Sequence, residues 1–189
     1  MAFTGSTEIG KILRVATAGT GKKISLELGG KSPVIVFDSA DLDSAVESVV
    51  DAIWFNQGQV CSAGSKLLVQ STVFDKFITK LKTRLGSFRI GDSLDKTIDM
   101  AAIVDESQVK VSHLVDYLIY NVNFQRKSVA AFVEEAREEG ADVFQIDCPP
   151  GCFYPPTLIT GVNTASKVVM EEIFGPVLVA MPFRCVVKK

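Results

Sequence analysis

Short apolar runs alternate along this chain with segments whose apolar residues recur at helical spacing, and this alternation constrains the fold most. The short runs predict strands at residues 2–4, 24–28, 34–37, 66–70, 142–146, 157–159 and 177–180. Amphipathic helices are predicted at residues 6–16, 42–55, 74–85 and 131–139. Strands separated by helices imply an α/β fold with a largely parallel sheet. The uninterrupted run at 34–37 further predicts a strand buried on both faces.

Composition narrows the class of protein. The 189 residues are 47% hydrophobic and 22% charged, with a formal net charge of -2, which is typical of a soluble globular protein. There is no basic stripe, so nucleic acid is not an expected partner. The start of the sequence lacks the features of a secretory signal, and no apolar run has the length of a membrane span. We therefore expect a cytoplasmic protein.

Residue types that bind metals are scarce. The cysteines are Cys61, Cys148, Cys152 and Cys185, and His113 is the only histidine. A structural zinc site would need more ligands, so no metal is expected. A disulfide between Cys148 and Cys152 is an alternative, but a cytosolic chain would keep both thiols reduced. The acidic residues at 38–43 are interpreted as a helix cap by Ser39 or Asp41. A calcium loop needs a turn glycine and a distal glutamate, and this segment lacks both.

Three local features carry candidate chemistry. Cys61 follows a predicted helix and precedes a predicted strand, and catalytic groups commonly lie in such loops. Glu27 lies between two leucines at a strand end, where a carboxylate is a candidate general base. Gly5 and Ser6 open a helix whose N–H groups suit a phosphate. Each feature also has an ordinary explanation: a cysteine in the core, a glutamate on the surface, and a simple helix cap.

Four segments, in order along the chain, resemble signatures of the aldehyde dehydrogenase family. Residues 3–10 (FTGSTEIG) resemble its FTGSTxxG segment, and residues 26–33 (LELGGKSP) match its LELGGKSP signature. Residues 55–64 (FNQGQVCSAG) resemble FNxGQxCxAG, and residues 171–177 match EEIFGPV. The resemblance covers nearly the whole chain apart from 109–125 and the last few residues. Smaller details resemble most the family 16 branch, whose members carry two dehydrogenase-like regions.

The resemblance implies an aldehyde dehydrogenase-like three-layer α/β/α parallel sheet from an incomplete catalytic domain, and it implies site roles. Cys61 would attack the aldehyde carbonyl as a thiolate, and its backbone N–H would help hold the oxyanion. Hydride would pass to NAD or NADP, and Glu27 would activate the water that hydrolyses the thioester. Cofactor contacts would come from Gly5, Ser6, Gly10, Leu28, Gly29, Glu172 and Phe174. The expected partners are a small-molecule aldehyde and, in a full-length parent, further copies in a homo-oligomer.

The resemblance also implies a domain organisation. Residues 1–29 would be the C-terminal remnant of the NAD-binding domain, residues 30–183 a partial catalytic domain, and residues 184–189 an aberrant tail. Residues 109–125 match no segment of the family pattern, so we interpret them as an insertion, with a longer helix as the alternative. Both ends look cut. The family's earlier segment that supplies a second oxyanion donor is not found, and the loss of one such donor costs about 10²–10³ in rate.

Three functions therefore remain to be compared. The first is NAD(P)-dependent oxidation of an aldehyde to a carboxylic acid through a thioester on Cys61. The second is a catalytically inactive interaction or regulatory fragment, because part of the cofactor site is expected to be missing. The third is a cofactor-free thiol esterase that uses the same cysteine. A papain-like enzyme is disfavoured, because the only imidazole, that of His113, lies in the predicted insertion.

Overall fold

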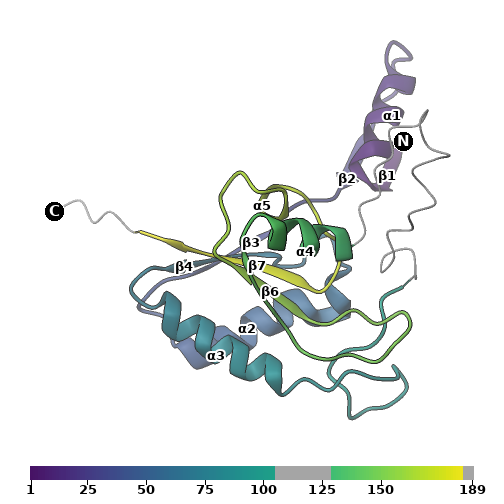
Figure 1. The fold of residues 1–189 in the computed structure, drawn as a ribbon. Helices are drawn as coiled ribbons and strands as arrows, with labels where there is room; N and C mark the ends of the chain where they lie inside the picture. Colours follow the sequence, from purple (N-terminus) through teal and green to yellow (C-terminus); the bar gives the residue numbers. More distant parts are fainter. Residues whose placement is uncertain (105–128, 185–189) are drawn as a thin grey trace. The chain divides into compact units, whose positions relative to one another are not determined.

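The computed structural model describes residues 1–104 and 129–184, which divide into two units (Figure 1). The first unit comprises residues 1–30, and the second begins at Lys31. This division falls beside the boundary expected between residues 29 and 30, although the assignment of the units to functional domains stays a prediction. The predicted insertion at 109–125, with His113, lies outside the described residues, and so does the tail beyond residue 184, with Cys185.

The first unit is a βαβ motif. Strands β1 (Ala2–Gly5) and β2 (Ser25–Leu28) pair in parallel and are connected through helix α1 (Thr7–Thr17). The predicted elements are confirmed, and part of the apolar side of the helix is exposed. Ile9 is 37% exposed and Ile12 is 50% exposed. Helical spacing of apolar residues predicts the helix, whereas burial requires a second surface to cover that face.

The second unit is built on a five-stranded sheet in the order β3-β4-β7-β6-β5. Its strands are β3 (Pro33–Val36), β4 (Lys66–Gln70), β5 (Asp142–Gln145), β6 (Thr157–Thr160) and β7 (Val177–Phe183). Neighbouring strands are parallel except β5 and β6, which are antiparallel. These two strands are joined by a loop without a crossover helix, which suits an antiparallel pair. The predicted α/β class is therefore confirmed.

Helices cover both faces of this sheet (Figure 1). Helices α2 (Leu42–Trp54) and α3 (Phe74–Gly86) pack on one face, and α4 (Val129–Glu138) and α5 (Lys167–Met170) pack on the other. Successive residues of β7 point to opposite layers: Leu178 joins the core under α2 and α3, and Val179 joins the core under α4. The unit thus has the three layers that the family resemblance implies.

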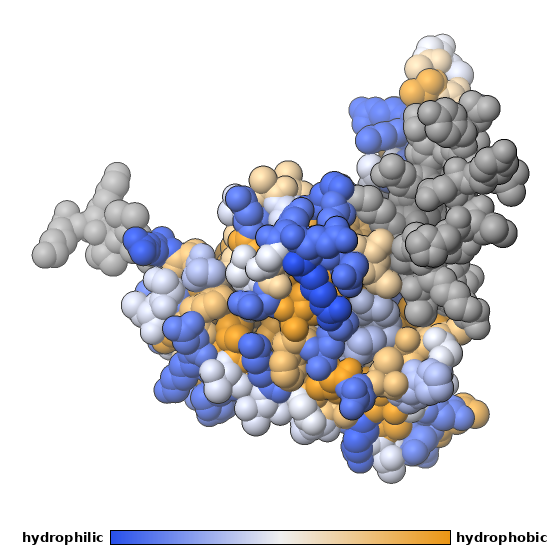
Figure 2. Space-filling model, viewed as in Figure 1, coloured by the Kyte–Doolittle hydropathy of each residue, from blue (hydrophilic) through white to orange (hydrophobic). Residues whose placement is uncertain are grey.

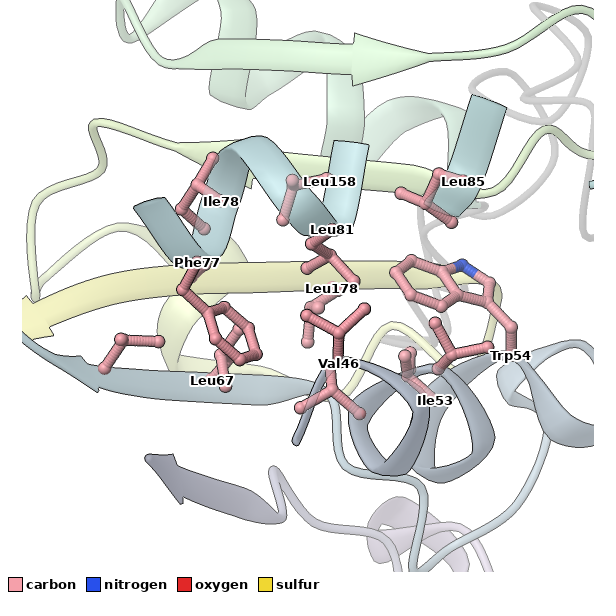
Figure 3. Packing of buried hydrophobic residues seen from close by; sticks show 14 of the residues in the cluster. Val46, Ile53, Trp54, Leu67, Phe77, Ile78, Leu81, Leu85, Leu158 and Leu178 are labelled. Carbon is pink, nitrogen blue, oxygen red and sulfur yellow. The ribbon is translucent and has the colours of Figure 1, made fainter. Parts of the chain in front are cut away.

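Local sequence explains where these helices begin and which face they bury. The side chain of Asp41 accepts a hydrogen bond from Ser44 N at 2.8 Å, so the cap interpretation of residues 38–43 is confirmed. The same hydrogen bonding lowers the pKa of the Asp41 carboxyl. In α3, Phe77 and Leu81 lie one turn apart and are fully buried, and Figure 3 shows both pointing toward the sheet.

Strand β3 differs from the prediction for residues 34–37. It lies at the edge of the sheet order, next to β4. Ile35 is 52% exposed, and Phe37, which follows the strand, is 47% exposed. The expected burial on both faces is therefore wrong for this strand. An uninterrupted apolar run indicates a strand, but the position of that strand in the sheet is decided by long-range pairing.

Hydrophilic and hydrophobic residues are interspersed over the face of the second unit that Figure 2 shows. In residues 1–104 and 129–184, no helix is both long enough and apolar enough to cross a membrane. The longest helices of this unit, α2 and α3, instead bury one apolar side against the sheet and leave charged residues on the other.

Candidate active site

Cys61 lies in an exposed turn between α2 and β4. Just ahead of it, the short turn η1 (Phe55–Gly58) holds Asn56 and Gln57 in the left-handed backbone region, with φ of 49° and 57°. Asparagine tolerates this region, but glutamine adopts it uncommonly, and residues held in such conformations cluster at functional sites. The thiol is therefore presented to solvent by a backbone whose path the neighbouring packing determines.

The backbone that follows Cys61 is fixed from the interior. Gly64 N donates a hydrogen bond to the carbonyl of Ala52 in α2 at 2.8 Å. A Cβ atom at position 64 would lie 2.6 Å from Val34 Cγ2, so this approach requires glycine. Within residues 1–104 and 129–184, no oxygen accepts a hydrogen bond from the backbone N–H of Cys61. That donor is available for the oxyanion role expected of it.

The second candidate segment, residues 171–177, leads into β7. Ile173 is buried, whereas Phe174 is 43% exposed and also has a left-handed backbone, with φ of 54°. Glu172 is partly buried. The exposed ring and the carboxylate are thus carried by a backbone that is anchored by the buried side chain between them. This segment belongs to the same unit as Cys61.

Residues 55–61, called the Cys61 turn from here on, contact the segment 171–177. A Cβ atom at Gly58 would lie only 2.2 Å from the carbonyl oxygen of Gly175. Beside this contact, Trp54 Nε1 donates a hydrogen bond to the carbonyl oxygen of Pro176 at 3.1 Å. The signatures identify both segments separately, but Trp54 was not a candidate. No local signal predicts a hydrogen bond between residues 122 positions apart.

Two glutamines beside Cys61 also escaped prediction. Gln59 is buried, and its Oε1 accepts a hydrogen bond from Val104 N at 3.0 Å. The Gln57 amide is oriented so that its oxygen accepts from Ala101 N at 3.1 Å. Both side chains therefore attach residues 101–104 to the Cys61 turn. Buried glutamines commonly satisfy the hydrogen-bonding groups of a loop backbone. The place of Gln59 within the FNxGQxCxAG signature was the only available clue.

The predicted phosphate-binding residues lie at the start of α1 in the first unit. Gly5 and Ser6 are exposed, and the Ser6 side chain accepts a hydrogen bond from Ile9 N at 3.4 Å. Gly10 is buried instead: a Cβ atom there would lie 2.7 Å from Leu28 Cδ2. Gly10 N is also bonded to Ser6 O at 3.0 Å. Gly10 therefore serves helix–strand packing, whereas the exposed helix start keeps the geometry of an anion site.

Glu27 is exposed in β2, opposite Thr4 of β1. Its flanking leucines do not enclose it, because alternate residues of a strand face opposite sides of the sheet. Leu28 and Gly29 are partly buried. The first unit thus brings Glu27 and Leu28 beside the strand that carries Gly5, and the second unit brings the Cys61 turn and residues 171–177 together.

Lys31 is a further unusual group in the second unit. Its Nζ atom is buried and has no hydrogen-bond partner among residues 1–104 and 129–184. The pKa of Lys31 is lowered to about 8, first by burial and then by the positive charge of Lys66, while the negative charge of Glu172 acts in the opposite direction. The charges at the starts of β3 and β4 and just before β7 therefore influence one another.

The remaining described cysteines are separate from these segments. Cys148 and Cys152 are free thiols in the loop between β5 and β6. Burial, together with the negative charge of Asp147, raises the pKa of Cys148. Within the described part of the chain, no group of three or more His, Cys, Asp or Glu side chains could hold a metal ion.

Comparison with protein-family models gives a match to the aldehyde dehydrogenase family over residues 1–119 and 120–186. The chain is 38% identical over 190 residues to aldehyde dehydrogenase [NAD(P)+] 2 of Saccharomyces cerevisiae, and the match covers 97% of this chain and 35% of that protein. It is 37% identical over 189 residues to betaine aldehyde dehydrogenase 1 of Oryza sativa, with 97% and 34% covered. The chain thus spans about a third of the length of these relatives.

Comparison with solved structures also gives matches to aldehyde dehydrogenases. The structure of betaine aldehyde dehydrogenase from Staphylococcus aureus in complex with NAD+ matches with a TM-score of 0.83 at 32% identity, covering 97% of this chain and 35% of that one. An aldehyde dehydrogenase from Bacillus cereus matches with a TM-score of 0.83 at 33% identity, covering 98% and 35%. The relatives include a human protein named mitochondrial and a rat protein named cytosolic. The cytoplasmic location therefore stays a prediction. The family 16 branch also stays a prediction.

Proposed function

The chain belongs to the aldehyde dehydrogenase family, and from that premise we propose that it carries the nucleophile and part of the cofactor site for NAD(P)-dependent oxidation of an aldehyde to a carboxylic acid. One observation carries this proposal most directly. The exposed Cys61 turn and the segment that bears Glu172 and Phe174 are packed against each other within one unit. A nucleophile and a cofactor contact must be held close for hydride to leave the carbon that the thiolate attacks.

The covalent steps use this chain's own groups. The Cys61 thiolate adds to the aldehyde carbonyl carbon, and the backbone N–H of Cys61 donates a hydrogen bond to the oxygen that gains the negative charge. Loss of hydride from the same carbon leaves a thioester on Cys61. Glu27 then takes a proton from water as the water adds to the thioester carbonyl. Collapse of the resulting tetrahedral intermediate breaks the carbon–sulfur bond, releases the carboxylic acid and returns Cys61 as the thiolate, and Glu27 passes its proton to solvent.

Each unit carries residues of the kinds that bind a part of a nicotinamide dinucleotide. When bound, NAD or NADP supplies the acceptor for the hydride. The exposed, Ser6-capped start of α1 offers backbone N–H groups of the kind that bind phosphate. The Glu172 carboxylate suits ribose hydroxyls, and the 43% exposed Phe174 ring offers an apolar surface for the nicotinamide. The small-molecule aldehyde and the homo-oligomer of a full-length parent belong to the same proposal.

The first test is alkylation of the purified full chain with iodoacetamide, with and without NAD, followed by peptide mapping of all four cysteines. We expect Cys61 to react at least tenfold faster than Cys148 and Cys152, and NAD to change the Cys61 rate selectively. The Cys61→Ser chain serves as the control, in which the fast phase is absent and the rates at Cys148 and Cys152 are unchanged.

The outcomes separate the competing functions. Equal labelling of all cysteines with no effect of NAD would overturn the proposal and favour an inactive interaction or regulatory fragment. Turnover of an activated ester that needs Cys61 but is indifferent to NAD would favour the thiol esterase. In a full-length parent, NAD-dependent aldehyde oxidation should fall to background on Cys61→Ser, because hydride transfer follows formation of the bond to sulfur.

A further inference from the structure

Trp54 occupies a position that the proposed chemistry does not explain. It is the single tryptophan of the chain, and it ends α2 only seven positions before Cys61. Its side chain is 2% exposed, and Figure 3 shows it beside Ile53 and Leu85 in the core. Its ring meets Phe88 edge to face, with centroids 6.0 Å apart. A purely apolar side chain could fill this space, so the polar edge of the indole needs its own explanation.

The indole N–H is directed at the loop that precedes β7. Trp54 Nε1 donates to Pro176 O at 3.1 Å, and the same oxygen accepts a hydrogen bond from Thr157 N at 2.8 Å. Two donors, one from α2 and one from β6, thus converge on one carbonyl. Because the indole bond is buried, its loss without entry of water would leave the N–H donor unsatisfied, which costs free energy. The position of Pro176 is therefore tied to the end of α2.

The backbone contact next to this hydrogen bond is tightly packed. Gly58 approaches Gly175 so closely that position 58 has no room for a Cβ atom, which would lie 2.2 Å from Gly175 O. Position 175 has no room either, because a Cβ atom there would lie 2.4 Å from Val129 Cγ2 of α4. Gly58 also has φ of 69°. A displacement of residues 174–176 must therefore be transmitted to residues 54–58, because close-packed segments shift together rather than compress.

Three residues next to this contact have unusual backbone conformations. Asn56 and Gln57 precede Cys61, Phe174 precedes Gly175, and all three have left-handed backbones. Glutamine and phenylalanine keep such conformations only when surrounding contacts hold them, whereas asparagine tolerates them more readily. The Trp54 hydrogen bond lies where it can hold both strained turns at once.

We propose that Trp54 is a positioning residue that couples the segment bearing Glu172 and Phe174 to the Cys61 turn, so that a dinucleotide bound at the first changes the reactivity of the thiol at the second. This inference rests on the proposed function, because it takes residues 172 and 174 as cofactor contacts. It goes beyond that function by naming the connection between the two sites. Such couplings between sites typically amount to about 5–150-fold.

The test uses the full chain and two variants. Trp54→Phe keeps an aromatic ring but removes the N–H donor, whereas Phe88→Leu changes the packing around Trp54 and keeps the donor. The Cys61 alkylation rate is measured with and without NAD, and NAD affinity is measured by calorimetry. We expect NAD to change the Cys61 rate at least fivefold in the unmodified chain and in Phe88→Leu, but less than twofold in Trp54→Phe at saturating NAD.

A second measurement does not depend on how well a variant folds. Trp54 contributes the only indole N–H resonance of the chain, so its ¹⁵N–¹H signal reports directly on the bond to Pro176. We expect this signal to shift when NAD is added and again when Cys61 is alkylated.

The results distinguish this inference from the proposed function. If NAD changes the Cys61 rate equally in Trp54→Phe and in the unmodified chain, or leaves the indole signal in place while it changes that rate, the coupling through Trp54 is wrong and the proposed function stands. If NAD changes neither the rate nor the signal in the unmodified chain, both are overturned.

Discussion

Gly58 and Gly175 touch backbone to backbone: a Cβ atom at position 58 would stand 2.2 Å from the carbonyl oxygen of Gly175. The first residue precedes the candidate nucleophile, and the second follows the candidate cofactor contacts. The glycine of the first signature is therefore required by the second segment, and also by its own positive φ of 69°. Gly175 has a different steric reason, because a Cβ atom there would lie 2.4 Å from Val129 Cγ2 of α4.

Gly58→Ala should destabilise the chain by about 2–4 kcal/mol, because alanine is strained at the positive φ of this residue and its methyl group would overlap the Gly175 carbonyl. Urea denaturation followed by circular dichroism measures the free energy of unfolding. Gly86→Ala is the matched control, since nothing lies within 4 Å of a Cβ atom there. That change should be neutral or stabilise by about 0.5–1 kcal/mol. Equal effects at both positions would contradict the close approach.

Lys31→Met should stabilise the chain at pH 7. The folded-state pKa of Lys31 lies near 8, below its ordinary 10.5, so the fold disfavours the protonated amine. This penalty, about 3 kcal/mol at most, is fully present below pH 8 and disappears as pH rises from 8 to 10.5. The unfolding free energy of the unmodified chain should therefore approach that of Lys31→Met across this interval. A difference that stays constant from pH 7 to 10.5 would show that Lys31 is not buried as a charge.

Gln59→Leu should release residues 101–104 from the Cys61 turn. The change removes the Oε1 that accepts from Val104 N, at a cost of about 1 kcal/mol, and exposes that amide to faster hydrogen exchange. Gln70→Leu is the matched control, because Gln70 Oε1 accepts from Asp38 N in the same way. Each variant should speed exchange at its own partner amide only. Unchanged exchange at Val104 in Gln59→Leu would count against this anchor.

Asp147→Asn should make Cys148 more reactive. Burial is the larger cause of the raised pKa of the Cys148 thiol, and the neighbouring Asp147 carboxylate is the second. Removal of the negative charge lowers this pKa, so the thiolate fraction between pH 7 and 9 increases. Alkylation of Cys148 should accelerate by a few-fold in this interval, with the rate at Cys152 as the internal reference. An equal acceleration at both thiols would instead indicate that the loop has opened.

Local sequence predicted the elements well where neighbouring residues decide the conformation. The bounds of β4 agree with the predicted run at 66–70, and Asp41 caps α2 as its side-chain chemistry requires. The α/β class followed from the alternation of strands and helices, and the three layers were implied by the family resemblance. The predictions of burial were less successful. Ile35 is exposed, because burial depends on whether another element covers a face, and a single segment carries no record of that.

The candidate site shows the same division. The residue types and their order along the chain determined which groups can do chemistry: a cysteine in a turn, a glutamate in a strand, and a capped helix start. Only the tertiary structure decided that Gly10 serves packing, that Lys31 is buried, and that Trp54 holds Pro176. These relationships join residues that are distant along the chain, and they arise from strand order and close packing. A sequence pattern reports on neighbours within a few residues, so it cannot specify which distant backbone will meet a given glycine or indole.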